Sequence, residues 1–295
     1  MFNKGDKVAL VCCSNGRDRK QQHTIVQLTK YLEDLGFDVV VSPLLYAKES
    51  VFSGSGRERA EIINGYYRDD SVKAIMDISG GDVANMVLPY LDYEVIARHP
   101  KPFWGYSDLT TVINGIYTKT GNPGILYQMM NVVWDERGMQ RERMKRVLCK
   151  PSSDLPGECT LCKPRGSFIQ GTSMEGVVVG GNLRCFLKLA GTEYFPDLEA
   201  KILLLEGRGG SVAQYATYLA QLEQLGAFVK INGILLGTFI KMEEEQCVPT
   251  VSDLLLELLH HSDRERVRNL PVMKTYEIGH GMDSKLMQIG ACYRF

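Results

Sequence analysis

The chain has 295 residues, of which 44% are hydrophobic and 23% are charged, as in ordinary globular proteins. Its 34 lysines and arginines nearly balance its 35 acidic residues, and the net charge of −1 argues against nucleic acid or an acidic membrane as a partner. A chain of this length buries enough surface to fold without disulfides or metal, and two domains are expected.

The first apolar run, residues 8–13, is too short for the core of a signal peptide or for a membrane span. The chain holds eight cysteines, and the adjacent pair Cys12 and Cys13 is typical of free thiols in a reducing compartment. We therefore expect a cytoplasmic protein without a membrane partner.

Strand-like and helix-like segments alternate along the first half of the chain. Apolar runs bounded by turn residues predict strands, and apolar residues at helical spacing predict helices. This order predicts an α/β fold with a mostly parallel sheet and helices on both of its faces. The expected strands are 7–13, 37–42, 74–78 and 102–106, and the expected helices are 22–35, 57–67, 84–91 and 108–118.

Basic residues concentrate between Arg137 and Lys150, where Glu142 is the one acid. DNA contact is one interpretation, but a solvated linker helix is favoured because no aromatic side chains are interleaved. Residues 151–168 hold three prolines and two glycines, which suits a crossover between domains. The expected organisation is an N-terminal α/β domain at 1–137, a linker at 138–170 and a smaller C-terminal α/β domain at 171–295.

The C-terminal part repeats the alternation of strands and helices. Residues 177–182 lead into an expected helix at 183–189, the expected strands are 200–205, 233–239 and 274–278, and further helices are expected at 212–225 and 251–261.

Cys159 and Cys162 have the C-x-x-C spacing of some zinc and redox sites. Zinc would need four ligands, and no second such pair stands at structural-site spacing. A redox pair is expected at a helix N-terminus after a strand, whereas these two lie in a Pro/Gly-rich stretch. Plain thiols are therefore favoured, and no metal is expected.

Ser79-Gly80-Gly81-Asp82 ends an expected strand and opens an expected helix. Glycines at such a corner free backbone N–H groups to face an anion. The turn is therefore interpreted as an oxyanion hole, a phosphate cradle or simply a tight connection. The glycine spacings of nucleotide-binding loops are absent, so the phosphate cradle is the weaker of the two functional interpretations.

Ser107 stands where the expected strand 102–106 meets a helix that begins at Asp108. A serine at such a corner projects its Oγ above the sheet, as in a nucleophile elbow, and the amide of Asp108 would face an oxyanion. The alternative is a serine that merely caps the helix. The G-x-S-x-G pattern is not satisfied, because residue 109 is leucine.

Glu206 follows the buried-strand candidate 200–205, and His280 lies between Gly279 and Gly281 after the candidate 274–278. A carboxylate at a strand end can orient a histidine, or it can simply reach solvent. The order Ser107, Glu206, His280 is nucleophile, acid and base, the order of the α/β-hydrolases. The three residues together predict a serine hydrolase.

The sequence also resembles the serine LD-carboxypeptidases, a family that includes the microcin C self-immunity peptidases. The resemblance includes Gly-Tyr-Ser-Asp at 105–108, and it runs in the family's order along nearly the whole chain. The matching stretches are residues 4–8, 35–37, 80–82, 88–92, 105–110, 179–183, 191–197, 203–206 and 278–280.

The resemblance implies Ser107 as nucleophile, His280 as general base and Glu206 as its orienting acid, with amides near Gly81 and at Asp108 forming the oxyanion hole. It also implies an active site between two domains, a homodimer, and no metal or organic cofactor. The implied substrates are muropeptides, cleaved before a terminal D-alanine during cytoplasmic cell-wall recycling.

Two stretches depart from the family's usual pattern: Tyr127-Gln128-Met129-Met130 replaces His-Gly-Pro-Met, and Gln288-Ile289-Gly290 replaces Pro-x-Gly. Both would reshape the substrate pocket rather than the triad. Arg184 is a candidate for binding a substrate carboxylate, although a surface arginine is the simpler interpretation.

Three functions remain open from the sequence. The first is a serine peptidase that acts on muropeptides, and the second is an amidase that cleaves aminoacyl- or peptidyl-nucleotide amides with the same triad. The third is a non-catalytic two-domain protein that binds a small molecule, in which the three side chains would not converge.

Overall fold

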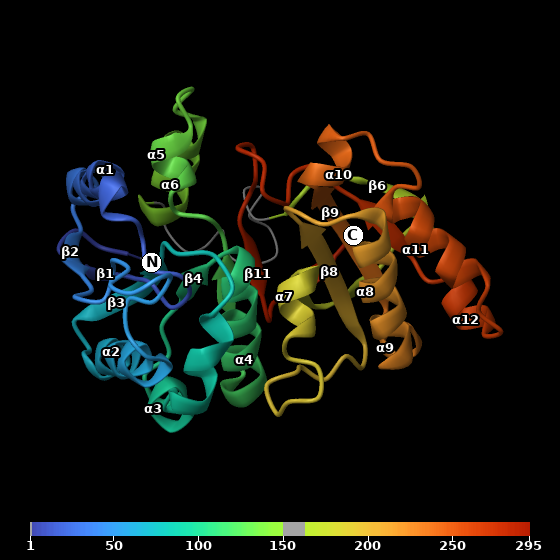
Figure 1. Ribbon diagram of the computed structural model, residues 1–295, viewed down its shortest axis with the longest axis horizontal. Coiled ribbons are helices and arrows are strands. Elements are labelled where there is room, and N and C mark those ends of the chain that lie inside the picture. Colours follow the sequence, from blue (N-terminus) through green and yellow to red (C-terminus); the bar gives the residue numbers. More distant parts are fainter. Residues whose placement is uncertain (1, 150–162) are drawn as a thin grey trace.

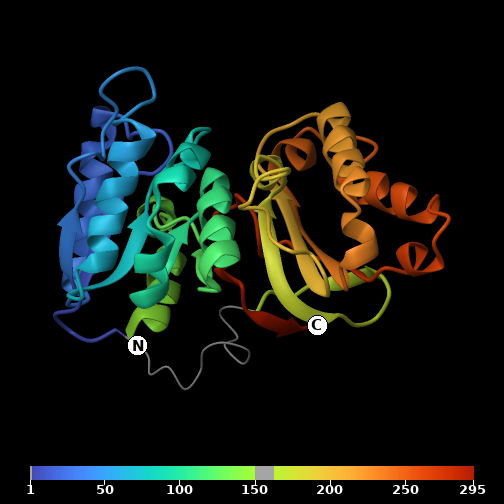
Figure 2. The ribbon, with the colours of Figure 1, turned by 90° about the horizontal axis from the view of Figure 1, so that it is seen from below.

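The computed structural model describes residues 2–149 and 163–295, which form two lobes, each built on a six-stranded sheet. Figures 1 and 2 show the lobes side by side, the N-terminal one in blue and green and the C-terminal one in yellow to red. Both sheets are mostly parallel and carry flanking helices, so the predicted α/β fold class is confirmed.

The first sheet has the strand order β11-β5-β4-β3-β1-β2. Its five strands from the N-terminal half run parallel, and β11 joins the edge antiparallel to β5. The strands are β1 (Lys7–Val11), β2 (Asp38–Val41), β3 (Val72–Asp77), β4 (Phe103–Gly105), β5 (Gly124–Leu126) and β11 (Met287–Ile289). The helices are α1 (Gln22–Asp34), α2 (Gly56–Arg68), α3 (Tyr93–Arg98), α4 (Thr110–Thr120), α5 (Asn131–Trp134) and α6 (Met139–Cys149), with 3₁₀ turns at Arg19–Gln21, Ala84–Tyr90 and Ser107–Leu109.

The second sheet has the order β12-β7-β8-β9-β10-β6, with antiparallel strands at both edges. Its strands are β6 (Ser167–Gln170), β7 (Glu175–Asn182), β8 (Lys201–Gly207), β9 (Gly233–Phe239), β10 (Val272–Lys274) and β12 (Cys292–Arg294). Its helices are α7 (Leu183–Leu187), α8 (Val212–Gln224), α9 (Ala227–Lys230), α10 (Ile240–Glu244), α11 (Val251–His260) and α12 (Glu265–Arg268).

The sequence of β1 explains why helices cover both faces of the first sheet. Val8 and Leu10 belong to the hydrophobic cluster that contains the buried side of α1, whereas Ala9 and Val11 belong to the cluster that contains the buried side of α2. Successive side chains of a strand point to opposite faces. A strand that is apolar at every position therefore needs cover on both sides, which the helices provide.

Helix α4 joins the lobes. The Asn114 side chain donates to the Gly180 carbonyl at 2.9 Å and accepts from the Gly180 amide at 2.9 Å. One turn earlier, Thr110 Oγ1 accepts from the Asn182 amide at 3.0 Å. These buried contacts tie α4 of the first lobe to β7 of the second, and they hold together the strand ends on which the candidate site lies.

Two of the expected elements differ in kind. Residues 84–90 form a 3₁₀ turn rather than an α-helix, and Pro89, which lacks an N–H donor, lies inside it. The strand expected at 274–278 is instead β10, which ends at Lys274. The following backbone leaves the sheet and runs past the end of β9, where the Ile278 carbonyl accepts from the Thr238 amide at 2.9 Å.

The basic stretch around 139–149 is the helix α6, which buries Gln140, Met144 and Leu148. Met144 and Leu148 belong to the hydrophobic cluster on the α1 side of the first sheet. No helix within residues 2–149 and 163–295 is long and apolar enough to cross a membrane.

Candidate active site

Ser107 lies at the corner between β4 and α4, with a φ of 56°. Left-handed backbone costs a non-glycine residue about 1 kcal/mol or more and persists only where the surroundings impose it. Here the chain must turn sharply from a buried strand into a helix, and the turn leaves Ser107 half-buried between the fully buried Tyr106 and Asp108. A serine on a strained strand-to-helix turn is the local geometry that the nucleophile-elbow prediction requires.

Glu206 is completely buried near the end of β8, and its Oε2 lies 2.7 Å from His280 Nδ1. Tyr106 donates its hydroxyl to the same Oε2 at 3.3 Å, and its ring lies 4.6 Å from the His280 ring, centroid to centroid. Burial raises the pKa of Tyr106 well above its usual value, so the hydroxyl stays protonated and remains a donor. Glu206 thus fixes one ring nitrogen of His280.

His280 lies on the loop between β10 and β11, not at a strand end. Gly279 has a φ of 148°, and a Cβ at that position would lie 1.7 Å from Thr238 Oγ1, so only glycine fits. Gln140 of α6 donates its side-chain amide to the carbonyls of Met282 and Ser284 just beyond the histidine. The loop is therefore held from both lobes.

Ser107 and His280 line one cavity of about 500 Å³, together with Gly80 and Gly81. His280 Nε2, the nitrogen opposite the Glu206 contact, is buried and has no hydrogen-bond partner in the described part of the chain. An imidazole with one nitrogen on a carboxylate and the other free is arranged to accept a proton. The structure thus brings the three predicted residues to one site.

The backbone amides of Gly81 and Asp108 donate no hydrogen bond within residues 2–149 and 163–295. Gly81 has a φ of 132°, and a Cβ there would lie 2.2 Å from the Asn15 side chain, so the turn can pass this close only with glycine. Gly81 lines the cavity together with Ser107, and Asp108 directly follows Ser107 in the chain. Free amides at this place can stabilise negative charge on an oxygen.

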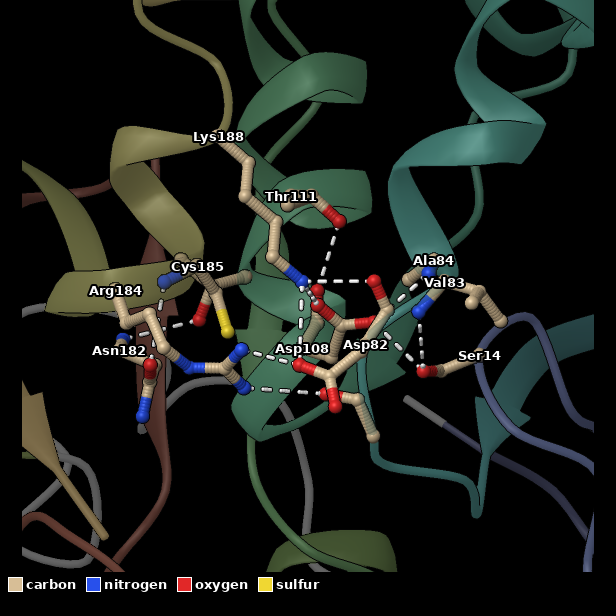
Figure 3. A network of polar contacts seen from close by, with 12 residues as sticks. Ser14, Asp82, Val83, Ala84, Asp108, Thr111, Asn182, Arg184, Cys185 and Lys188 are labelled. Atoms are coloured by element: carbon tan, nitrogen blue, oxygen red, sulfur yellow. Dashed lines mark hydrogen bonds and ion pairs between the residues drawn. The ribbon is translucent and has the colours of Figure 1, made fainter. Parts of the chain in front are cut away.

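The Asp108 side chain is the centre of a buried polar network that Figure 3 shows. Its Oδ2 accepts from Ser14 Oγ at 2.6 Å and from the Ala84 amide at 2.8 Å, and its Oδ1 accepts from Lys188 Nζ at 2.5 Å. Lys188 follows α7 and also donates to the Asp82 carbonyl at 2.8 Å. One carboxylate beside Ser107 thus connects both lobes.

We expect Lys188→Met to lower the free energy of unfolding by about 3 kcal/mol, because it leaves the buried Asp108 carboxylate without its cation. Urea unfolding checks this. Lys119→Met is the matched control, since Lys119 pairs with Glu193, whose side chain is 66% exposed, and should cost less than about 1 kcal/mol. Equal losses in the two variants would contradict a structural role for the Asp108–Lys188 pair.

Arg184, the candidate for a substrate carboxylate, forms an ion pair with Asp82 and donates to the Gly81 carbonyl at 3.3 Å. The hydrogen bond from Arg184 holds the pKa of Asp82 below its usual value, so the pair stays ionised at neutral pH. Arg184 borders a second cavity of about 350 Å³, which also meets Ser107. Its charge is already compensated there.

Cys159 and Cys162 lie outside the described residues. Cys12, Cys13 and Cys185 are buried free thiols. Within the described ranges, no group of three or more His, Cys, Asp or Glu side chains is arranged to hold a metal ion.

The residues at the site that are not predicted from the sequence include Arg17, Tyr106, Gln140 and Lys188. Tyr106 adjoins Ser107, and its place in the Gly-Tyr-Ser-Asp stretch is the one signal that could have indicated it. Gln140 and Lys188 reach the site only through long-range packing, which no local pattern encodes.

In comparisons with known proteins, the two parts of the chain match the two domains of one family. Residues 8–127 match the LD-carboxypeptidase N-terminal domain, and residues 175–295 match the LD-carboxypeptidase C-terminal domain. The Bacillus subtilis protein named "Putative carboxypeptidase YocD" is 29% identical over 312 residues, which cover 99% of this chain and 94% of that protein.

Two solved structures share the fold. One is the microcin C7 self-immunity protein MccF in complex with aspartyl sulfamoyl adenosine, and a protein of that name from Escherichia coli is also a relative in sequence. The structure matches with a TM-score of 0.85 and 23% identity over 100% of this chain and 94% of that one. A muramoyltetrapeptide carboxypeptidase from Oxalobacter formigenes matches with a TM-score of 0.77 and 19% identity over 97% and 93%. With both halves matched in order, the chain belongs to the LD-carboxypeptidase family.

Proposed function

We propose that this protein is a serine peptidase that removes a terminal D-amino acid from a cell-wall peptide. The observation that carries the proposal is the state of His280: Nδ1 lies 2.7 Å from the buried Glu206 carboxylate, Nε2 has no partner in the described chain, and the residue lines the same cavity as Ser107. Family membership supports the reaction class.

The reaction proceeds through an acyl-enzyme. Ser107 Oγ attacks the carbonyl carbon while its proton moves to His280 Nε2, and the carbonyl oxygen becomes negative. The amides of Gly81 and Asp108 donate to that oxygen. The C–N bond then breaks as Nε2 returns the proton to the leaving amine, and water releases the peptide by the same proton route.

We place this reaction in the cytoplasm, where cell-wall peptides are recycled. The adjacent thiols of Cys12 and Cys13, both buried and free, support a reducing compartment.

The second candidate is an amidase that acts on aminoacyl nucleotides. It is favoured by the likeness in fold to MccF, whose structure holds aspartyl sulfamoyl adenosine. The triad would be the same, and only the group that occupies the cavity would differ.

The experiment is a turnover assay of the purified protein on both substrate classes. We expect D-alanine release from an L,D-tetrapeptide. Hydrolysis of aspartyl sulfamoyl adenosine to aspartate and sulfamoyl adenosine should be slower. Turnover of the nucleotide alone would replace the first candidate with the second. Binding of either compound without turnover would indicate the non-catalytic protein.

A further inference from the structure

Arg17 enters the active-site cavity from the loop after β1. Its backbone is fixed, because its amide donates to the Leu45 carbonyl at 2.8 Å and its carbonyl accepts from the Ala47 amide at 3.0 Å. The guanidinium carbon lies 5.6 Å from the centre of the Trp134 ring. The side chain therefore has a defined position on one wall of the cavity.

The donors of this guanidinium are largely unused. Nε and Nη2 are buried and have no hydrogen-bond partner in the described chain, and Nη1 has one contact at 3.5 Å, to the Ile78 carbonyl. No carboxylate of the described residues lies within ion-pair distance of Arg17. Buried donors without acceptors are costly, which indicates a missing partner.

The charge of the cavity indicates the chemistry of that partner. Its lining includes Arg17 and Arg208, and neither Asp nor Glu is among the lining residues. Arg208 also lacks an ion pair within the described ranges. Two cations without an ion-pair partner in the described chain, the partly buried Arg17 and the exposed Arg208, lie beside the candidate nucleophile Ser107 and attract an anion.

Two other arginines show that this situation is particular to Arg17. Arg59, whose side chain is also buried, donates through Nη1 to the carbonyls of Cys13 and Ser14. Arg184, on the neighbouring cavity, is neutralised by Asp82. Arg17 is thus the partly buried cation on the cavity wall whose Nε and Nη2 have neither a hydrogen-bond partner nor a carboxylate in the described chain.

We propose that Arg17 binds a carboxylate of the substrate and so selects peptides that carry a free acid within reach of Ser107. This inference deepens the proposed function and rests on it. A guanidinium presents two parallel N–H groups to a carboxylate, which gives both affinity and orientation. The same carboxylate chemistry has two sources: the terminal carboxylate of the leaving residue, or an acidic side chain on the acyl side.

The test uses Arg17→Met, which keeps an unbranched side chain against Trp134 but removes the charge, and Arg17→Lys, which keeps the charge but not the paired donors. Arg19→Met is the matched control, because the Arg19 guanidinium lies over Tyr46, 5.2 Å from the ring centre, and does not line the cavity. Three substrates are compared. The first is an L,D-tetrapeptide with a free terminal carboxylate and an acidic side chain on the acyl side of the scissile bond, the second has the terminal carboxylate replaced by an amide, and the third has the acidic side chain replaced by an amide.

We expect wild-type protein to prefer the free acid over one of the two amides by about 100-fold in kcat/KM. Arg17→Met should lose that preference, mainly through a higher KM, Arg17→Lys should recover part of it, and Arg19→Met should keep it. Which amide is rejected identifies the source of the carboxylate. Unchanged preference in Arg17→Met would overturn the inference while leaving the peptidase function intact.

A binding measurement distinguishes failure of the proposed peptidase function from failure of the proposed carboxylate site. Calorimetric titration of the same peptides into Ser107→Ala, with and without Arg17→Met, reports binding without turnover. Tetrapeptide binding that needs Arg17, in a wild-type protein that does not hydrolyse it, would reject the peptidase and retain the carboxylate site. No binding of any of the three peptides would reject the carboxylate site as well.

Discussion

Replacement of Ser107 with alanine is expected to lower kcat by at least about four orders of magnitude, because Oγ is the one atom proposed to form the acyl-enzyme. The remaining rate would come from the oxyanion donors and from substrate binding. The measurement is D-alanine release under saturating tetrapeptide. Turnover near that of the wild type would rule out serine catalysis at this site.

The backbone at Ser107 provides a control for folding. Alanine meets the same left-handed strain at a φ of 56° as serine does, so Ser107→Ala should unfold at nearly the wild-type temperature. Glycine relieves that strain, and Ser107→Gly should be equally inactive yet more stable by about 1 kcal/mol. A destabilised glycine variant would show that the strain is not intrinsic to the turn.

Replacement of Glu206 with glutamine is expected to lower kcat by about two to four orders of magnitude with a smaller change in KM. In the proposed mechanism the carboxylate stabilises the cation that His280 becomes in the transition state, so its loss should lower the rate of the chemical step. A carboxamide keeps the size and can still accept from Nδ1, but it carries no charge.

The neighbouring hydroxyl supplies the comparison. Tyr106→Phe removes only the 3.3 Å donor to the same Glu206 oxygen, and we expect less than a tenfold loss in kcat. Circular dichroism checks that both variants fold. If Glu206→Gln turned over within threefold of wild type, another acid would have to orient His280.

The elements that could be predicted from the sequence are those with long apolar patterns. The strand expected at 233–239 is β9 to the residue, and the helices expected at 22–35 and 212–225 differ from α1 and α8 by a single residue at the C-terminal end. The three-residue strands β5, β11 and β12 are not predicted, since so short a segment has no measurable periodicity.

The residues of the candidate site likewise fall into those that the apolar pattern predicts and those that it does not. Ser107 lies just after β4 and Glu206 near the end of β8, and both strands have a strong apolar signal that predicts a place at the carboxyl ends of the strands. The partners of Asp108 and the unpaired donors of Arg17 depend on residues far away in the chain. Lys188 reaches Asp108 from the other lobe, and the lack of an ion-pair partner for Arg17 among the described residues is a property of the folded cavity rather than of any motif.

The course of the chain around His280 imposes an order on biosynthesis. His280 lies on the segment that connects β10 of the second sheet to β11, which is the edge strand of the first sheet and pairs with β5. While a nascent chain emerges from the ribosome, one edge of β5 is therefore unpaired, and His280, the proposed general base for Ser107, has not yet been synthesised. Residues 280–289 supply both the missing strand and the histidine, so the synthesis of this segment completes the first sheet and the proposed catalytic triad together. A nascent chain is therefore expected to lack the proposed peptidase activity until the first sheet is complete.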